Sequence, residues 1–197
     1  MAYYPVFLEL KNRPCLVIGG GRIAWDKARQ LVRAGARVTV VAPVLGAGMK
    51  RLKAGGRVRW RRKTFGPGDL KGVELVIAGT DQQPVNERVF RECRRRRIWV
   101  NVVDQPKLCA FIVPSMVRRG RLTLAISTGG ASPALSKWIR KDLERRYGPE
   151  LGRLLTRLAR GRGKILKAVP DYNKRKRVYE AAMQAYFEVL KKRIGWK

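Results

Sequence analysis

The sequence predicts an α/β fold: a doubly wound parallel sheet, then a small α+β arm and a helical C-terminal segment. Short apolar runs typical of buried strands alternate with helical patterns up to about residue 112. The first of these runs ends in three consecutive glycines, directly before a helical pattern. Beyond residue 112 the alternation gives way to two short strands and then to helices alone. The first part is therefore expected to be of the Rossmann type.

The glycine turn after the first predicted strand has the pattern of a dinucleotide-binding fingerprint. Gly19 permits the tight turn, and Gly21 lets the backbone approach a pyrophosphate. Ala24 allows the following helix to pack closely on the strand. The helix N-terminus, at Arg22 and Ile23, offers its N–H groups to the phosphates. The alternative is a glycine turn that serves packing alone.

The second predicted strand, residues 38–41, departs from the simple fingerprint. Such a strand usually ends in Asp or Glu, which binds the adenosine ribose. Here it is followed by Ala42, Pro43 and Val44, so backbone groups near Pro43 and Val44 would have to meet the ribose. The residues by themselves leave open whether NAD or NADP is bound.

Two further predicted strands end in polar residues. Thr80 and Asp81 follow the strand at 75–78, and Asp104 follows the strand at 99–103. Because the carboxyl ends of parallel strands meet at one edge of a sheet, we expect these residues and the glycine turn to line one crevice. The predicted cofactor-binding residues are Gly19, Gly21, Arg22, Ile23, Pro43, Val44, Thr80 and Asp81.

The chain is expected to have three parts. Residues 1–112 form the dinucleotide-binding domain, 113–148 a hairpin and helix for dimerisation and substrate, and 149–197 a basic helical domain. Because a hairpin and one helix are too small to close a core, we predict a dimerisation arm. The alternative is a lid that packs on its own sheet.

Several local elements are predicted around this framework. A short leading strand is expected at residues 4–10, and strands at 111–114 and 122–126 are expected to form the hairpin. The helix that starts at residue 133 is expected to bury three apolar side chains, Leu135, Ile139 and Leu143.

The loop before that helix is rich in hydroxyl groups and glycine. Ser132 is predicted to cap the helix, with a proline at its first position. Ser127, Thr128 and the backbone from Gly129 to Ser132 could cradle substrate carboxylates at the helix N-terminus. The alternative is a plain capping turn.

Charge is the unusual feature of the composition: 45 Lys and Arg stand against 14 Asp and Glu, a formal net charge of +31. Such a balance predicts an acidic partner, whether nucleic acid, anionic lipid or a polycarboxylate ligand. The alternative is a generally basic surface that serves no particular partner. The basic residues are spread from Lys11 to Lys197, so a dedicated nucleic-acid tail is not expected.

Other residue types narrow the chemistry further. The sequence has no His, so imidazole catalysis and His metal ligation are excluded. Its three cysteines, Cys15, Cys93 and Cys109, are widely spaced and form no metal-ligand pattern, so no metal site is predicted. Without an apolar run of the roughly 20 residues that span a bilayer, and without a signal peptide, a cytoplasmic protein is expected.

Five stretches together carry a family resemblance: residues 17–28, 40–43, 78–86, 101–115 and 126–133. They resemble the precorrin-2 dehydrogenases, a family that includes the amino-terminal half of bifunctional sirohaem synthases. The segments Asn-Val-Val-Asp at 101–104 and Ser-Thr-Gly-Gly-Ala-Ser-Pro at 127–133 are the most specific. The resemblance covers about residues 3–145 and weakens in the helical tail.

The resemblance implies NAD as the cofactor, since the family uses it despite lacking the ribose-binding carboxylate. It also implies oxidation of precorrin-2 to sirohydrochlorin, and both tetrapyrroles carry eight carboxylates that a basic crevice would attract. Asp104 is then the predicted general base, as in the family; the alternative is a loop cap before Pro106.

Two function questions stay open at this level. Some members of the family insert ferrous iron, but a chain without His and with few acidic residues near the crevice predicts weak or absent ferrochelatase activity. The other function class is a nucleotide-sensing regulator that binds nucleic acid without catalysis. No helix-turn-helix pattern supports that reading.

Overall fold

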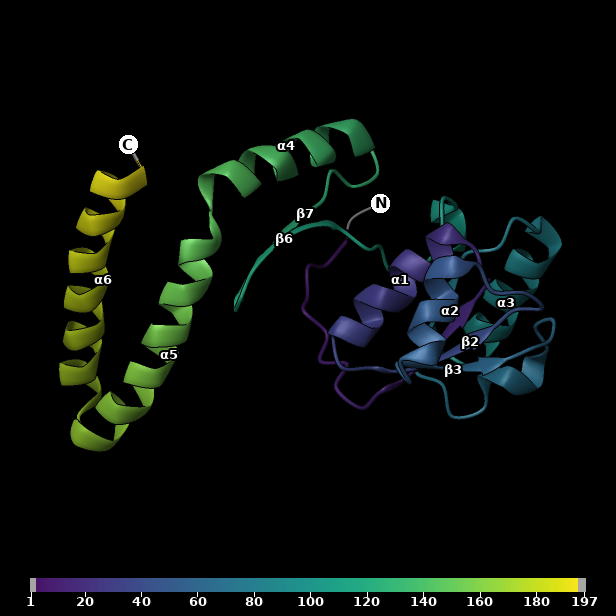
Figure 1. Cartoon of the computed structure of the whole chain (residues 1–197), viewed down its shortest axis with the longest axis horizontal. Coiled ribbons are helices and arrows are strands. Elements are labelled where there is room, and N and C mark those ends of the chain that lie inside the picture. The colour runs from purple at the N-terminus through teal and green to yellow at the C-terminus, as the bar shows by residue number, and fades with distance from the viewer. Residues whose placement is uncertain (1–2, 195–197) are drawn as a thin grey trace. The chain divides into compact units, whose positions relative to one another are not determined.

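The computed structural model describes residues 3–194 and divides into two compact units, residues 1–113 and 114–197 (Figure 1). Residues 1–2 and 195–197, the outer ends of the first and last predicted domains, lie outside the described residues. None of the helices in the described part of the chain combines the length and apolar character needed to cross a bilayer.

The first unit is built on a five-stranded parallel sheet in the order β3-β2-β1-β4-β5. β1 lies at its centre, and the strand order reverses between β1 and β4, where open α/β sheets bind ligands. The predicted doubly wound sheet is confirmed. Its strands are β1 (Pro14–Ile18), β2 (Arg37–Val41), β3 (Val58–Arg61), β4 (Leu75–Ala78) and β5 (Trp99–Val102).

Helices cover both faces of this sheet because successive side chains of a buried strand point to opposite sides. Cys15 and Val17 of β1 belong to one core, which also holds the buried faces of two helices, α1 (Arg22–Arg33) and α2 (Ala47–Ala54). Leu16 and Ile18 belong to the other core. That core is closed by α3 (Gln83–Arg95) and a short 3-10 helix, η1 (Pro67–Leu70); a second one, η2 (Pro106–Leu108), follows β5.

The second unit has the predicted hairpin followed by helices. Strands β6 (Ser115–Arg119) and β7 (Leu122–Ile126) pair antiparallel, and Gly120 between them has a φ of +58°. A Cβ on Gly120 would lie 3.1 Å from the Cα of Gly152, so a glycine there also permits close packing of the turn on a helix. The helices are α4 (Pro133–Arg146), α5 (Pro149–Ala168) and α6 (Tyr172–Ile194).

Three local predictions are wrong. Residues 4–10 form no strand, and Tyr4 and Phe7 are exposed, because β3 and β5, the edges of the sheet, take no further partner from this segment. Residues 111–114 lie before the hairpin, which begins at Ser115. Leu135 is 48% exposed on α4, because the two-stranded sheet is too narrow to cover the whole apolar face of this helix.

Beyond the end of β3, one buried carboxylate ties the chain together. The Oδ1 atom of Asp69 lies 2.9 Å from Arg61 Nη1 and 3.0 Å from Lys63 Nζ, and its Oδ2 atom accepts the Gly66 N–H at 3.0 Å. Burial would raise the pKa of this carboxyl. The hydrogen bonds from Gly66, Lys63 and Arg61 outweigh burial and hold the pKa below its ordinary 3.8.

The Asp69 side chain is only 1% exposed, so its loss should destabilise the protein. At neutral pH we expect Asp69→Asn to lower the free energy of unfolding by about 2 kcal/mol, measured by urea denaturation. Because the folded pKa is depressed, this stabilisation is complete above the unfolded value and is lost as the pH falls through the folded one. The difference in the free energy of unfolding between the parent protein and Asp69→Asn should therefore become smaller below pH 3.8.

The matched control is Glu74→Gln, which removes a pair with Arg13 whose side chains are 58% and 48% exposed. Such an exposed pair contributes about 0–1 kcal/mol, so this variant should unfold nearly as the parent does. Equal losses in the two variants would contradict the assigned role of Asp69.

Candidate active site

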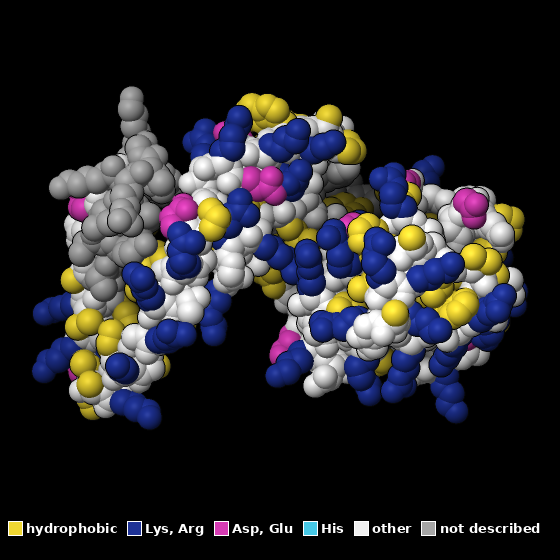
Figure 2. All heavy atoms as spheres, viewed as in Figure 1, with side chains coloured by type: hydrophobic (Ala, Val, Ile, Leu, Met, Phe, Trp, Pro, Cys, Tyr) yellow, Lys and Arg dark blue, Asp and Glu magenta, His cyan; other side chains and the backbone are white. Residues whose placement is uncertain are grey.

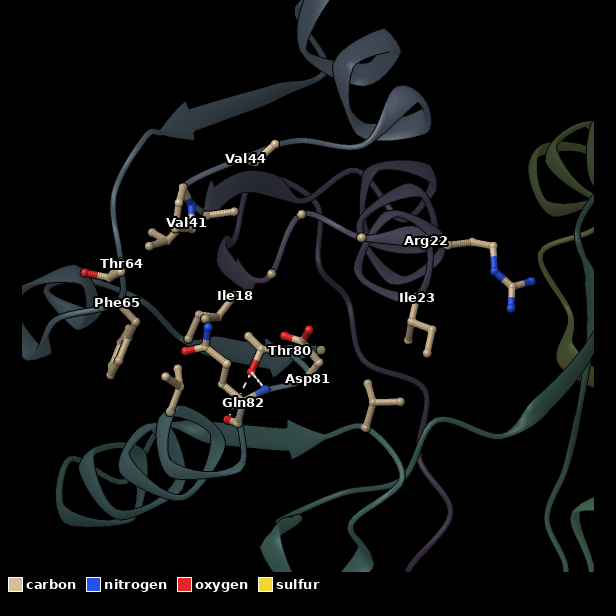
Figure 3. Close-up of a pocket in the computed structure, with 18 of the residues that line it drawn as sticks. Ile18, Arg22, Ile23, Val41, Val44, Thr64, Phe65, Thr80, Asp81 and Gln82 are labelled. Atoms are coloured by element: carbon tan, nitrogen blue, oxygen red, sulfur yellow. Dashed lines mark hydrogen bonds between the residues drawn. The ribbon is translucent and has the colours of Figure 1, made fainter.

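A crevice of about 660 Å³ opens at the carboxyl ends of the strands of the first unit (Figure 3). Five loops supply its walls, one after each of β1 to β5. All the residues predicted for the cofactor lie along it, and so does Asp104. The eight are Gly19, Gly21, Arg22, Ile23, Pro43, Val44, Thr80 and Asp81. The topology therefore brings together residues that stand up to 85 positions apart in the chain (104 minus 19).

The glycine turn packs tightly against the segments that follow β2 and β4. Gly19 has a φ of +118°, and a Cβ there would lie 2.5 Å from the carbonyl oxygen of Gly79. A Cβ on Gly20 would lie 2.0 Å from the carbonyl oxygen of Val44. Both positions thus need glycine for packing, which means that the packing role and the binding role of this turn coexist.

Gly21 has a different environment from its two neighbours. Its φ is −78°, which suits any residue, and a Cβ there would meet nothing within 4 Å. Gly21 is also the N-cap of α1, whose first turn has neither a side-chain cap nor an acidic residue. An open glycine beside uncapped helix N–H groups forms a cradle that fits a diphosphate, so the residues present fit a dinucleotide.

Arg22 and Ile23 begin α1 at the edge of this cradle. Figure 3 shows the Arg22 side chain extending away from Thr80 and Asp81. The contribution of Arg22 to the crevice is accordingly its place in the first turn of the helix rather than its guanidinium.

The turn after β4 is held by a buried amide that the sequence did not assign a role. Thr80 Oγ1 donates to Asn86 Oδ1 at 2.8 Å, and Asn86 Nδ2 donates to the carbonyl of Thr80 at 3.0 Å. The Gln82 N–H also donates to Thr80 Oγ1, at 3.2 Å. Asn86 is buried in α3, so this network fixes the turn that carries Asp81.

Asp104 follows β5 in the left-handed region, with a φ of +61°. This conformation costs most residues about 1–2 kcal/mol, and Asp and Asn tolerate it best. Among the described residues, none forms a hydrogen bond or ion pair with its carboxylate, so it does not act as the cap of the loop before Pro106. The carboxylate is exposed on the wall of the crevice.

The segment that follows Asp104, residues 105–111, is fastened to β5 by a second buried amide. Asn101 Nδ2 donates to the carbonyl of Phe111 at 2.9 Å and lies 3.4 Å from the sulfur of Cys109. The Cys109 thiol lies 3.2 Å from the carbonyl oxygens of Val102 and Gln105. Burial raises the pKa of Cys109, which keeps its S–H available as a donor. These contacts hold in place the loop that begins at Asp104.

The wall of the crevice beyond β3 is made of residues that the sequence did not single out. Lys63, Thr64 and Phe65 line the crevice, and Figure 3 shows Thr64 and Phe65 on the side opposite Arg22. The signal that could have found them is the strand order, because β3 pairs with β2 and their ends must lie side by side. Ile18, Val41, Ala42, Gln82, Val85 and Val103 also line the crevice and were not among the predicted site residues.

The predicted substrate residues lie in the second unit, between β7 and α4, and their hydroxyl groups are engaged locally. Ser132 Oγ accepts the Leu135 N–H at 3.1 Å, which confirms the predicted N-cap. Thr128 Oγ1 donates to the carbonyl of Ser132 and accepts its N–H, and Ser127 Oγ accepts the N–H of Gly129. The loop is thus a capping turn; a further role toward substrate stays a prediction.

Searches against known proteins give consistent results. A model described as "Putative NAD(P)-binding" matches residues 6–115, and one described as "Sirohaem biosynthesis protein central" matches residues 119–146. The siroheme synthase of Photobacterium profundum is 38% identical over 190 residues, which are 96% of this chain and 40% of that protein. The siroheme synthase of Methylobacillus flagellatus is 42% identical over 184 residues, 93% of this chain and 39% of that protein.

The chain thus spans about two fifths of the length of these relatives. A solved structure, that of SirC, precorrin-2 dehydrogenase, matches over its whole length. It superposes with a TM-score of 0.79 at 30% identity and covers 96% of this chain. The resemblance drawn from the sequence is confirmed: this chain belongs to the precorrin-2 dehydrogenase family.

Proposed function

We propose that this chain is an NAD-dependent oxidoreductase that converts precorrin-2 to sirohydrochlorin. The observation that carries the proposal is that the diphosphate cradle at Gly21 and the free carboxylate of Asp104 line one crevice in a member of this family. Oxidation removes a hydride and a proton from the substrate. A bound NAD supplies the hydride acceptor, and it leaves as NADH.

In this proposal the residues of the chain bind the cofactor and accept the proton. The first-turn N–H groups of α1 bind the diphosphate, and the backbone at Pro43 and Val44 meets the adenosine ribose. Asp104 accepts the proton that the substrate loses as the hydride departs, and the contacts of Asn101 and Cys109 hold the loop that begins at Asp104. No imidazole competes for this role, because the sequence has no His.

Charge supports an anionic substrate. Figure 2 shows Lys and Arg side chains spread over the visible face of the first unit rather than gathered in one patch. An eightfold carboxylate such as precorrin-2 would be attracted to such a surface, and so would nucleic acid. The carboxylate in the crevice favours the enzyme over the nucleic-acid-binding regulator, and the assays below separate the two.

The proposal extends to three further properties of the protein: weak or absent iron insertion, a homodimer, and a cytoplasmic location. The chain has no His, and the crevice is lined by two carboxylates, Asp81 and Asp104; this donor set favours weak or absent iron insertion. Leu135 and Trp138 of α4 are 48% and 63% exposed, which supports a homodimer formed through the second unit. We place the protein in the cytoplasm.

Binding of NAD should depend on the open position at Gly21. Gly21→Asp should fold normally, because the φ of −78° and the free space accept a side chain. Its affinity for NAD should be at least about 100-fold lower than that of the parent, since a carboxylate would stand where the diphosphate binds. Isothermal titration measures this, with circular dichroism for the fold.

Gly163→Asp, in α5, makes the same charge change at another open glycine that does not line the crevice, and should bind NAD as the parent does. Unchanged NAD affinity in a folded Gly21→Asp protein would remove the cradle from the proposal.

Catalysis should depend on the carboxylate of Asp104. Asp104→Asn keeps the shape and tolerates the φ of +61°, so the loop should be retained. With precorrin-2 and NAD under anaerobic conditions, the variant should form sirohydrochlorin about 100-fold more slowly or worse, the scale of general-base catalysis. NAD affinity should be unchanged in the same variant.

Glu74→Gln provides the comparison, because it removes an exposed carboxylate that does not line the crevice, and it should retain the activity. Full activity in Asp104→Asn would exclude the general-base role. The parent protein, given sirohydrochlorin and ferrous iron without NAD, should form little sirohaem; rapid formation would contradict the iron part of the proposal.

The second unit should pair two copies of the chain. Sedimentation at micromolar concentration should give about twice the monomer mass of 22.4 kDa. Trp138→Lys should shift the population toward the monomer, whereas Lys137→Ala, on the neighbouring exposed position, should not. A parent protein that stays monomeric at high concentration would refute the dimer.

A further inference from the structure

The side of the crevice formed after β2 and β3 has a charge that the proposed reaction does not use. Its two lining carboxylates, Asp81 and Asp104, follow β4 and β5. The lining residues after β2 and β3 include one cation, Lys63, and no acidic residue. Selectivity for NAD over NADP usually depends on a carboxylate at the end of β2, which binds the ribose and disfavours a 2′-phosphate. That source of discrimination is missing here.

Lys63 lines the crevice after β3, the strand that pairs with β2, and the missing carboxylate would stand at the end of β2. Val41 of β2 pairs with Arg61 of β3, and the Ala42 N–H donates to the carbonyl of Arg61 at 3.3 Å. Pro43 and Lys63 each follow two residues after this pair, and both line the crevice. The chain turns directly after β3, where the Lys63 N–H donates to the carbonyl of Arg61 at 3.0 Å, and this turn puts Lys63 on the crevice wall next to the segment that follows β2.

The ion pair with Asp69 leaves Lys63 able to bind an anion. Asp69 is a single carboxylate shared by two cations, Arg61 and Lys63, so the cluster keeps a net positive charge. The Asp69 side chain is 1% exposed and does not line the crevice, whereas that of Lys63 is 51% exposed. An ammonium group has three N–H donors, of which Asp69 engages one face. The pair thus orients Lys63 rather than neutralising the wall.

We propose that this crevice accepts NADP as well as NAD, and that Lys63 is the residue that receives the 2′-phosphate. The inference rests on the proposed cofactor site. It makes Lys63 the specificity-determining residue of that site: a phosphate monoester at the ribose gains a charge-assisted contact from Lys63, and no carboxylate opposes it.

The test is a set of binding titrations by calorimetry with NAD, NADP and two fragments, 2′,5′-ADP and 3′,5′-ADP. The fragments carry equal charge, so they separate a specific contact from the general attraction of a basic protein. NADP should bind within about tenfold of NAD, and 2′,5′-ADP more tightly than its 3′ isomer. Lys63→Ala should lower the affinity for NADP and 2′,5′-ADP about fivefold to tenfold, while the affinity for NAD changes less than about twofold.

Lys71→Ala is the matched control, an exposed lysine that does not line the crevice, and should leave the NADP-to-NAD ratio unchanged. Lys63→Gln, which keeps an N–H donor for Asp69 but removes the charge, should weaken NADP as Lys63→Ala does while NAD still binds. Folding of each variant is followed by thermal denaturation, and Arg61 still pairs with Asp69 in both.

NADP that binds more than about 100-fold more weakly than NAD would overturn the inference. An equal loss of both fragment isomers in Lys63→Ala would overturn it as well, because it would show general charge attraction. Failure of NAD itself to bind the parent protein would instead refute the proposed function, so the two outcomes are distinguishable.

Discussion

The close approach of three backbone segments at the glycine turn is the constraint on which the rest of this structure depends. The ends of β2 and β4 press on Gly19 and Gly20, where any Cβ would lie 2.0–2.5 Å from a carbonyl oxygen. The N–H groups of Gly19 and Gly79 continue the sheet across this junction, donating to Val41 and Ile18. Only because these chains meet so closely does α1 begin directly at the crevice, with Gly21 left open at its end.

Two buried side-chain amides hold the loops that carry the carboxylates of the crevice. Asn86 and Asn101 are among the few buried polar residues of the first unit, and each fastens a loop that carries a crevice carboxylate. A buried amide must be hydrogen-bonded to be tolerated, and its fixed partners then define the loop. Asp69 works similarly beyond β3, where it is buried and holds two cations. The polar groups of this core are thus concentrated where loops need a defined shape.

Charge is arranged unevenly around the crevice of this family member. The acidic residues follow β4 and β5, on the side where the proposed chemistry takes place, and Lys63 follows β3. This division separates a wall suited to proton transfer from a wall suited to anionic parts of a nucleotide. The large net charge of +31 exceeds what one crevice needs, and Lys and Arg side chains are spread over both units (Figure 2).

The sequence by itself determined the class of the first unit, its strands from β1 to β5 and the residues at the strand ends. It did so because glycine, buried apolar runs and helix caps act locally. It also pointed to the family, through the segments that follow β5 and β7. It misjudged which apolar stretches find partners: residues 4–10 pair with no strand, with Leu10 alone among their apolar side chains packed on a core, and Leu135 is 48% exposed. Only the tertiary structure decided that Lys63 lines the same crevice as Pro43 and that Asn101 holds the loop of Asp104. The first depends on the pairing of β2 with β3, and the second on the way residues 105–111 fold back onto β5; no spacing along the chain encodes either.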